Sequence, residues 1–186
     1  MTKYVSIIGN GESRRGFDLS PLKLFSTVIG CNAIYRDYVI DYLCCADKHM
    51  CQQAVNSVGK GTTIYTRDNW AGQFANWSNV KEFPKLPYAG DKRQDEPFHW
   101  GTGPYAGVLG LTFKPKAIFM LGFDLHPLEK DKINNIYTGS EGYTYIKRPV
   151  DPSYWIYQFQ WKQHGNVFQE TYDGMAKFIN KQLTKK

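Results

Sequence analysis

The chain has 186 residues, a hydrophobic content of 42% and an aromatic content of 16%, which indicates one folded domain over residues 1–186 with a substantial core. Its net charge of +6 suits phosphorylated ligands, nucleic acid or an anionic surface equally. No apolar run reaches the roughly 18 residues of a membrane-spanning helix, and the N-terminus lacks the features of a signal peptide. We therefore expect a soluble, cytoplasmic protein.

The first element in the chain is a short apolar strand over residues 4–8, followed by the sequence Gly-Asn-Gly-x-Ser at residues 9–13. An apolar run this short that ends at a glycine is typical of a strand buried on both faces of a parallel sheet. The glycines permit positive φ and close backbone approach, and Asn10 and Ser13 are candidate helix caps. The amides of such a turn suit a phosphate, and the alternative is a plain tight turn.

Strands and helices then alternate along the chain. Further strands are predicted at residues 26–32, 41–47, 62–66, 116–121 and 166–169. Helices are predicted to begin at Ser20 and to cover residues 48–58, 101–113, 153–164 and 171–183. Long irregular segments separate them at residues 68–100 and 127–152, and the second has the character of a lid. The alternation predicts a single Rossmann-like α/β domain with a mostly parallel sheet, flanking helices and long loops.

Small polar residues stand at the carboxyl ends of the predicted strands and at the start of one helix. They are Asn10, Ser13, Asn32, Asp47, Asp68, Thr102 and Asp124. Ligands bind outside the carboxyl ends of the strands in sheets of this kind, so we expect these residues to converge on one rim. The alternative is that they are ordinary caps and turns, with Asp47 and Thr102 as helix N-caps.

The four cysteines are Cys31, Cys44, Cys45 and Cys51, and their spacing fits no zinc-binding pattern. Cys44 and Cys45 are adjacent within an apolar run, which is typical of buried free thiols. We therefore expect free thiols in the core and no metal site.

Four short motifs follow one another in a defined order. They are Gly-Asn-Gly-x-Ser at residues 9–13, Cys-Asn at 31–32, Gly-Thr-Gly at 101–103 and Leu-Gly-Phe-Asp at 121–124. This order resembles the bacterial sialyltransferases of glycosyltransferase family 42 and related uncharacterised phage and bacterial proteins, over residues 4–126. The resemblance implies a Rossmann-like glycosyltransferase of phage origin that takes a CMP-sugar as donor and requires no metal or other cofactor.

The resemblance also implies a set of nucleotide-binding residues at the positions that match the family's motifs. They are Gly9, Asn10, Gly11, Ser13, Asn32, Asp47, Thr102, Gly103, Gly122 and Asp124. Asp47 departs from the family, which has an asparagine there. Thr102 replaces a serine of the family and keeps its hydroxyl.

The catalytic residues depart further from the family pattern. The family's general base is a histidine well beyond the lid, and this chain has no histidine at the matching place. His126 stands where the family has a tyrosine, and it is our candidate base because an imidazole with a pKa of about 6.5 suits proton transfer. The alternative is a turn residue before Pro127. Tyr137 is the candidate for a second, phosphate-binding tyrosine of the family.

Further residues complete the expected mechanism. Arg14, Arg15 and Lys130 are candidates to neutralise phosphate charge. Trp100 and Tyr143 are candidates to stack on a sugar or a base, with core packing as the alternative.

Together these features predict a nucleotide-sugar-dependent glycosyltransferase in which the nucleotide is the leaving group, with an acceptor that the sequence does not identify. The alternative is a catalytically inactive nucleotide-binding accessory protein, which the missing histidine favours, so whether the chain is an enzyme stays open here. Nucleic-acid binding ranks below both, because the chain has no recognised motif and no clustered basic helix.

Overall fold

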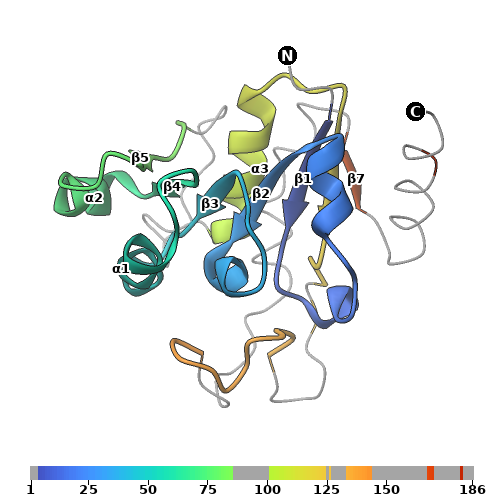
Figure 1. Ribbon diagram of the computed structural model, residues 1–186, viewed down its shortest axis with the longest axis horizontal. Helices are drawn as coiled ribbons and strands as arrows, with labels where there is room; N and C mark the ends of the chain where they lie inside the picture. Colours follow the sequence, from blue (N-terminus) through green and yellow to red (C-terminus); the bar gives the residue numbers. More distant parts are fainter. Residues whose placement is uncertain are drawn as a thin grey trace, which may run out of the picture.

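The structure is a computed structural model that describes residues 4–85, 101–124, 126, 133–143, 167–169 and 181. In these residues seven strands form one all-parallel sheet in the order β5-β4-β3-β2-β1-β6-β7 (Figure 1). The strands are β1 (Tyr4–Ile8), β2 (Thr27–Cys31), β3 (Tyr42–Cys44), β4 (Thr63–Thr66), β5 (Val80–Glu82), β6 (Ala117–Leu121) and β7 (Val167–Gln169). The predicted Rossmann-like α/β fold is therefore confirmed.

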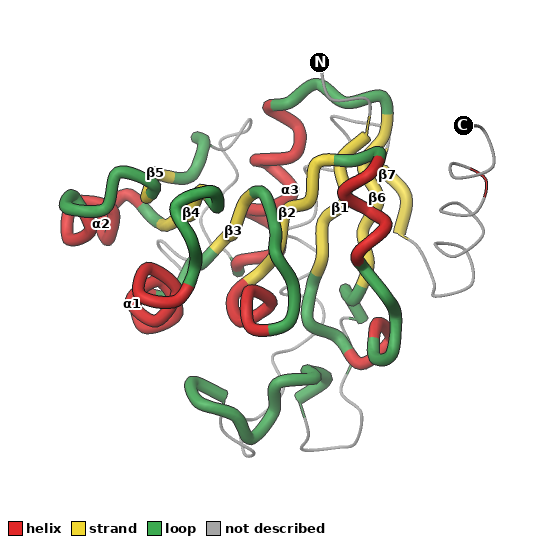
Figure 2. The backbone as a smooth tube through the Cα atoms, viewed as in Figure 1, coloured by secondary structure: helices red, strands yellow, loops and turns green. Residues whose placement is uncertain are grey.

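Helices connect these strands, as Figure 2 shows in red. The α-helices of the described residues are α1 (Lys48–Ser57), α2 (Asp68–Ala71) and α3 (Thr102–Thr112). Short 3-10 helices occur at η1 (Glu12–Arg14), η2 (Ser20–Leu24), η3 (Asn32–Arg36) and η4 (Gly72–Phe74). The predicted strands at 26–32, 62–66, 116–121 and 166–169 and the predicted helices at 48–58 and 101–113 correspond to these elements.

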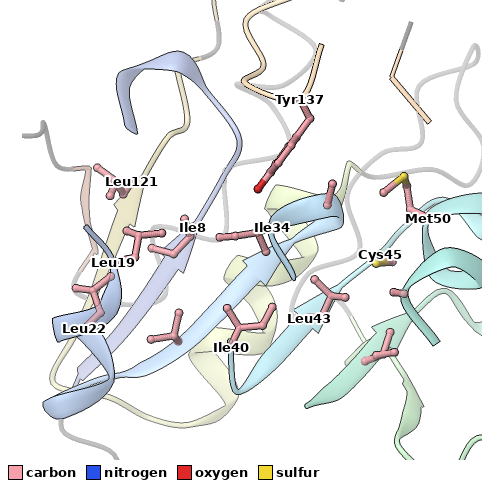
Figure 3. Close-up of a cluster of buried hydrophobic side chains, with 14 of the residues drawn as sticks. Ile8, Leu19, Leu22, Ile34, Ile40, Leu43, Cys45, Met50, Leu121 and Tyr137 are labelled. Carbon is pink, nitrogen blue, oxygen red and sulfur yellow. The ribbon is translucent and has the colours of Figure 1, made fainter. Parts of the chain in front are cut away.

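The core lies on both faces of the sheet, because successive side chains of a strand point to opposite faces. On one face, Ile8 and Leu121 pack with residues of η2, η3 and α1 (Figure 3). On the other, Ile7 and Met120 pack against α3. All residues of β6 are buried, and this explains why β6 has apolar residues at every position rather than alternate ones.

The order in which strands are added to the sheet changes side at β1. Val5 of β1 faces Thr27 of β2 on one side and Ile118 of β6 on the other. The strands from β2 to β5 extend outward from one side of β1, and β6 and β7 lie on its other side. The carboxyl ends of β1 and β6 therefore form the topological switch point, where open α/β sheets bind ligands.

Several predicted local details are wrong. Thr102, an expected N-cap, is instead the first residue of α3, whose N-cap is Gly101. The helix predicted to begin at Ser20 is present as η2. Neither Asn10 nor Ser13 caps η1, whose N-cap is Gly11 without a side-chain bond. The side chains of Asn10, Ser13 and Thr102 are hydrogen-bonded elsewhere and so do not cap a helix.

Asp47 does stand at the N-cap position of α1, but its side chain makes no capping hydrogen bond. The expectation that residues 68–100 are irregular is also wrong over 68–82, which contain α2, η4 and β5. β5 is a three-residue edge strand whose Lys81 and Glu82 are exposed, so it carries no apolar run to predict it.

Other expectations lie outside the described residues. These include the helix at 153–164, all of the helix at 171–183 except Lys181, and all of the predicted lid except residues 133–143. Lys130 and Trp100 are outside them too. Across the part of the chain that is described, no helix has the length and apolar character needed to cross a membrane. The same residues contain no group of three or more potential metal ligands.

Candidate functional site

The turn after β1 packs directly on the turn after β6. The Gly9 amide donates to the Leu121 carbonyl at 2.8 Å, and the Gly11 amide donates to the Gly122 carbonyl at 2.9 Å. A Cβ atom added to Gly9 would overlap the Gly122 carbonyl oxygen. Of these glycines only Gly122 has a positive φ, of 74°. Gly9 and Gly11 are therefore needed for close approach and not for positive φ.

The amides at the start of η1, which the sequence predicts to suit a phosphate, already have acceptors. The Ser13 amide donates to Asp124 Oδ2 at 2.9 Å, and the Ser13 hydroxyl donates to Oδ1 of the same carboxylate. The Glu12 amide donates to Asn134 Oδ1 at 2.7 Å. A Cβ on Gly11 would overlap the Asp124 carboxylate. The chain therefore supplies its own anion to this turn, and a phosphate could bind there only by displacing Asp124.

Three predicted site residues meet at the ends of β1, β2 and β3. Asn10 Nδ2 donates to the Cys31 carbonyl at 3.0 Å. The Thr102 hydroxyl donates to Asn32 Oδ1 at 3.0 Å and accepts from the Ala46 amide at 3.1 Å. These contacts join the switch point to the N-terminus of α3 through uncharged amide and hydroxyl groups. Such groups can act as hydrogen-bond donors or as acceptors to a ligand.

The N-terminus of α3 lies close to the β6 turn. A Cβ on Gly103 would stand 2.6 Å from Cε1 of Phe123, so only glycine lets the helix start approach this ring. The first amides of a helix have no partner within it. The amides of Thr102 and Gly103 therefore stand at the positive end of α3.

Arg14 is the buried cation of the site. Its side chain is 3% exposed, and Nε donates to the Gly9 carbonyl at 2.7 Å. Nη2 donates to Asn10 Oδ1 at 3.4 Å and to the Tyr137 hydroxyl at 2.9 Å. The Tyr137 hydroxyl in turn donates to the Asp37 carboxylate. Arg14 therefore holds the chain together and is not free to reach a phosphate, contrary to its expected role.

Burial chiefly raises the pKa of Tyr137, and its donation to the Asp37 carboxylate raises the pKa further, while Arg14 opposes both. The phenol is consequently neutral at physiological pH and cannot act as a base. Its hydroxyl proton is committed to Asp37. In this arrangement Tyr137 is a structural hydrogen-bonding group, and a role in binding phosphate would require it to leave both partners.

His126 is exposed beside the Asp124 turn. Its Nδ1 contacts the Asp124 carbonyl oxygen, which only accepts, so Nδ1 carries the proton. In a neutral imidazole the lone pair is then on Nε2. This tautomer leaves Nε2 available as a general base next to the switch point.

The remaining predicted residues differ in their surroundings. Asp47 is exposed, and no hydrogen bond or ion pair of its carboxylate is found among the described residues. Asp68 accepts from the Asn69 amide at 2.7 Å in α2. Arg15 is paired with Glu12 on the surface. Tyr143 packs against the core cluster, so the alternative of core packing describes it better than stacking on a ligand.

Three residues of the site were not predicted. Asn134 bonds the Glu12 amide from 122 residues away. Asp37 accepts from Tyr137 across 100 residues. Arg36 donates to the Ser140 hydroxyl at 2.8 Å. No signal in the sequence connects these pairs, because each contact depends on how residues 133–143 lie across the sheet.

Comparisons of the chain with models of known protein families, with curated proteins and with solved structures gave no match.

Proposed function

We propose that the carboxyl edge of the sheet binds a nucleotide or nucleotide sugar, with a CMP-sugar as the first candidate, and that the protein is a glycosyltransferase of the sialyltransferase-like kind. One observation carries the proposal. Asn10, Asn32 and Thr102 come from three distant segments and meet at the switch point: Thr102 donates to Asn32, and Asn10 donates to the carbonyl of Cys31, the residue before Asn32. A cytoplasmic, phage-encoded protein is part of the same proposal.

The chemistry of the edge suits such a ligand. Amide and hydroxyl groups of Asn10, Asn32 and Thr102 match the donors and acceptors of a base and a ribose. The amides of Thr102 and Gly103 at the start of α3 suit a phosphate, since a helix N-terminus attracts anions. They are also better placed than the η1 amides, which Asp124 and Asn134 occupy.

In a transfer reaction the nucleotide would be the leaving group, and the α3 amides would stabilise the charge that develops on its phosphate. His126 Nε2 would take the proton from the acceptor hydroxyl. The Asp124 carbonyl, which accepts from Nδ1, would keep the imidazole in the tautomer that this step requires.

A second function is a nucleotide-binding accessory protein without catalysis. The occupation of the η1 amides by the chain's own groups favours it, because a turn filled in this way leaves less room for a transferring phosphoryl or glycosyl group. The two functions share a ligand and differ in turnover.

A thermal-shift panel of nucleotides and nucleotide sugars tests the shared part. At about 100 times its Kd, a ligand adds about 2.7 kcal/mol of stability, which corresponds to a rise in Tm of roughly 5 to 10 °C for a domain of this size. We expect CMP or a CMP-sugar to give this shift and other nucleotides not to. A panel without any hit contradicts both functions.

Donor hydrolysis by the purified protein then separates the two functions. If the protein is an enzyme, His126→Ala lowers turnover by on the order of 10² to 10⁴-fold and leaves the CMP shift unchanged. His49→Ala is the matched control, because His49 is another exposed histidine and has no role in the proposed reaction. A CMP shift with no turnover in the wild-type protein identifies the accessory protein.

A further inference from the structure

Residues 133–143, called the strap below, lie beyond the carboxyl ends of β1 and β2, where Figure 1 shows them in orange. The strap is bonded to the turn after β1 at two points. The Ile136 amide donates to the Asn10 carbonyl at 2.9 Å, and Asn134 Oδ1 accepts from the Glu12 amide at 2.7 Å. The strap therefore lies against Asn10, one of the residues to which we assign the ligand.

Arg36 fixes the far end of the strap. It donates to the Ser140 hydroxyl at 2.8 Å and to the Glu141 carbonyl at 2.8 Å. The same guanidinium donates to Gln53 Oε1 on α1 at 3.0 Å. The strap is thus bonded to η3 and, through Arg36, to a helix of the sheet's outer layer.

Tyr137 fixes the centre of the strap. Its ring is 8% exposed and reaches toward Ile8 and Ile34 of the core (Figure 3). Its hydroxyl accepts from buried Arg14 and donates to the carboxylate of exposed Asp37. Among the described residues Arg14 pairs directly with no carboxylate, so this hydroxyl alone connects the cation to an anion.

A second tyrosine of the strap, Tyr143, packs beside Tyr137. The ring of Tyr143 packs on the core cluster and lies 5.9 Å from the ring of Tyr137. Burial raises the pKa of the Tyr143 phenol, and the neighbouring Ala33 backbone and Asn10 side chain oppose that rise. Closure of the strap is therefore held at its centre by the Tyr137 hydroxyl and by the packing of both rings.

We propose that the strap is an autoinhibitory latch: in the ligand-free protein Tyr137, held between Arg14 and Asp37, keeps it across the carboxyl edge, and it must open before a nucleotide reaches Asn10 and Asn32. The identity of the ligand rests on the proposed function, whereas the latch itself does not. Opening would release the Asn10 carbonyl and the Glu12 amide for a ligand.

Hydrogen exchange of the amides in residues 133–143 tests the latch without any ligand. Tyr137→Phe removes only the hydroxyl that Arg14 and Asp37 share, and we expect exchange to rise by on the order of tenfold to a hundredfold, as for a lost bond to charged groups. Tyr143→Phe is the matched control in the same strap. It removes a hydroxyl that contacts neither Arg14 nor Asp37, so we expect a smaller rise in exchange than in Tyr137→Phe. Asp37→Ala, at an exposed position, repeats the test if Tyr137→Phe does not fold.

Equal exchange in wild-type, Tyr137→Phe and Tyr143→Phe proteins overturns the latch. CMP binding then tests autoinhibition: we expect the apparent Kd to tighten in Tyr137→Phe, because a larger fraction of the protein is open. Faster exchange with weaker CMP binding means that the strap belongs to the site and overturns autoinhibition. If no nucleotide binds to any variant, the proposed function is wrong. The hydrogen-exchange result still shows whether the Tyr137 hydroxyl holds the strap closed.

Discussion

Gly9 must be a glycine because the Gly122 carbonyl lies too close to admit a side chain. The backbone angles of Gly9 itself do not require a glycine. The turns after β1 and β6 are joined by amide-to-carbonyl bonds of 2.8 and 2.9 Å, and a side chain at Gly9 would separate them. Since β1 and β6 are neighbours in the centre of the sheet, one methyl group at this position affects the whole switch point.

Gly9→Ala should therefore destabilise the protein by roughly 1 to 3 kcal/mol, the range for overpacking a well-packed site. The matched control is Gly72→Ala. Gly72 has a φ of −59° and no atom within 4 Å of an added Cβ, so alanine there should stabilise by about 0.4 to 1 kcal/mol. Urea denaturation measures both. Equal free energies of unfolding for the two variants would show that the close approach is not needed.

At the residue scale, the sequence predicts which residues lie at the carboxyl edge of the sheet better than it predicts their hydrogen-bond partners. Their positions at strand ends and at a helix start predict that Asn10, Asn32 and Thr102 lie on one rim, and the ends of their segments do meet. It also predicts a phosphate at the η1 amides, where the structure has the Asp124 carboxylate. Composition and spacing cannot distinguish these outcomes, because an amide binds a side-chain carboxylate and a phosphate by the same physics.

The start of α3 is attached to the sheet by one hydroxyl. Thr102 Oγ1 donates to Asn32 at the end of β2 and accepts from Ala46 beyond β3. Both contacts are made by a residue that is 7% exposed. The hydroxyl that the sequence assigns to a helix cap therefore joins two strands to a helix.

Thr102→Val keeps the shape of the side chain and removes both hydrogen bonds. It leaves the buried Ala46 amide unpaired, and we expect a loss of about 1 to 3 kcal/mol in the free energy of unfolding. Thr102→Ser keeps the hydroxyl and should recover most of that loss. Chemical denaturation of the two variants decides the point, and a valine variant as stable as the serine variant would rule out the anchoring role.

At the element scale, runs of apolar and β-branched residues predict the strands β1, β2, β3, β4 and β6, and β6 is buried at every position. They do not predict β5, whose exposed residues lie at the edge of the sheet. Nor do they predict η3, since Asn32 begins it from a left-handed φ of 51°. Edge pairing and local turn geometry depend on neighbours that are distant in sequence. The spacing of apolar residues along the chain carries no information about such neighbours.

The four cysteines are buried free thiols, as predicted. Cys31 and Cys44 lie on one face of the sheet, and Cys45 and Cys51 lie on the other. Burial raises the pKa of Cys31 to about 12 and that of Cys51 to about 11. It also raises the pKa of Cys44 and Cys45 well above the ordinary value.

Because the folded pKa values exceed the unfolded value of 9.0, the unfolded chain loses these protons first. The stabilisation is complete below about pH 9 and is lost as the pH rises toward the folded values. We expect the free energy of unfolding to fall above about pH 9, by up to about 1.4 kcal/mol per pH unit for each thiol. Urea denaturation along a pH series measures the slope.

Cys51→Ala should reduce that slope by up to the contribution of one thiol, about 1.4 kcal/mol per pH unit. Its stability near neutral pH serves as the reference, since the substitution also removes a buried sulfur. A wild-type protein whose stability stays constant from neutral pH to about pH 10.5 would mean that the thiols titrate as they do in the unfolded chain.

Strand β1 has its two neighbours in the sheet at very different distances along the chain. Val5 pairs with Thr27 and with Ile118, so during synthesis β1 finds one partner early and the other only after more than half of the chain has been made. Until then one border of β1 presents open hydrogen-bonding groups, which favour association between nascent chains. A contact of such high sequence separation also slows folding. Completion of β6 is therefore the step at which the switch point can first form.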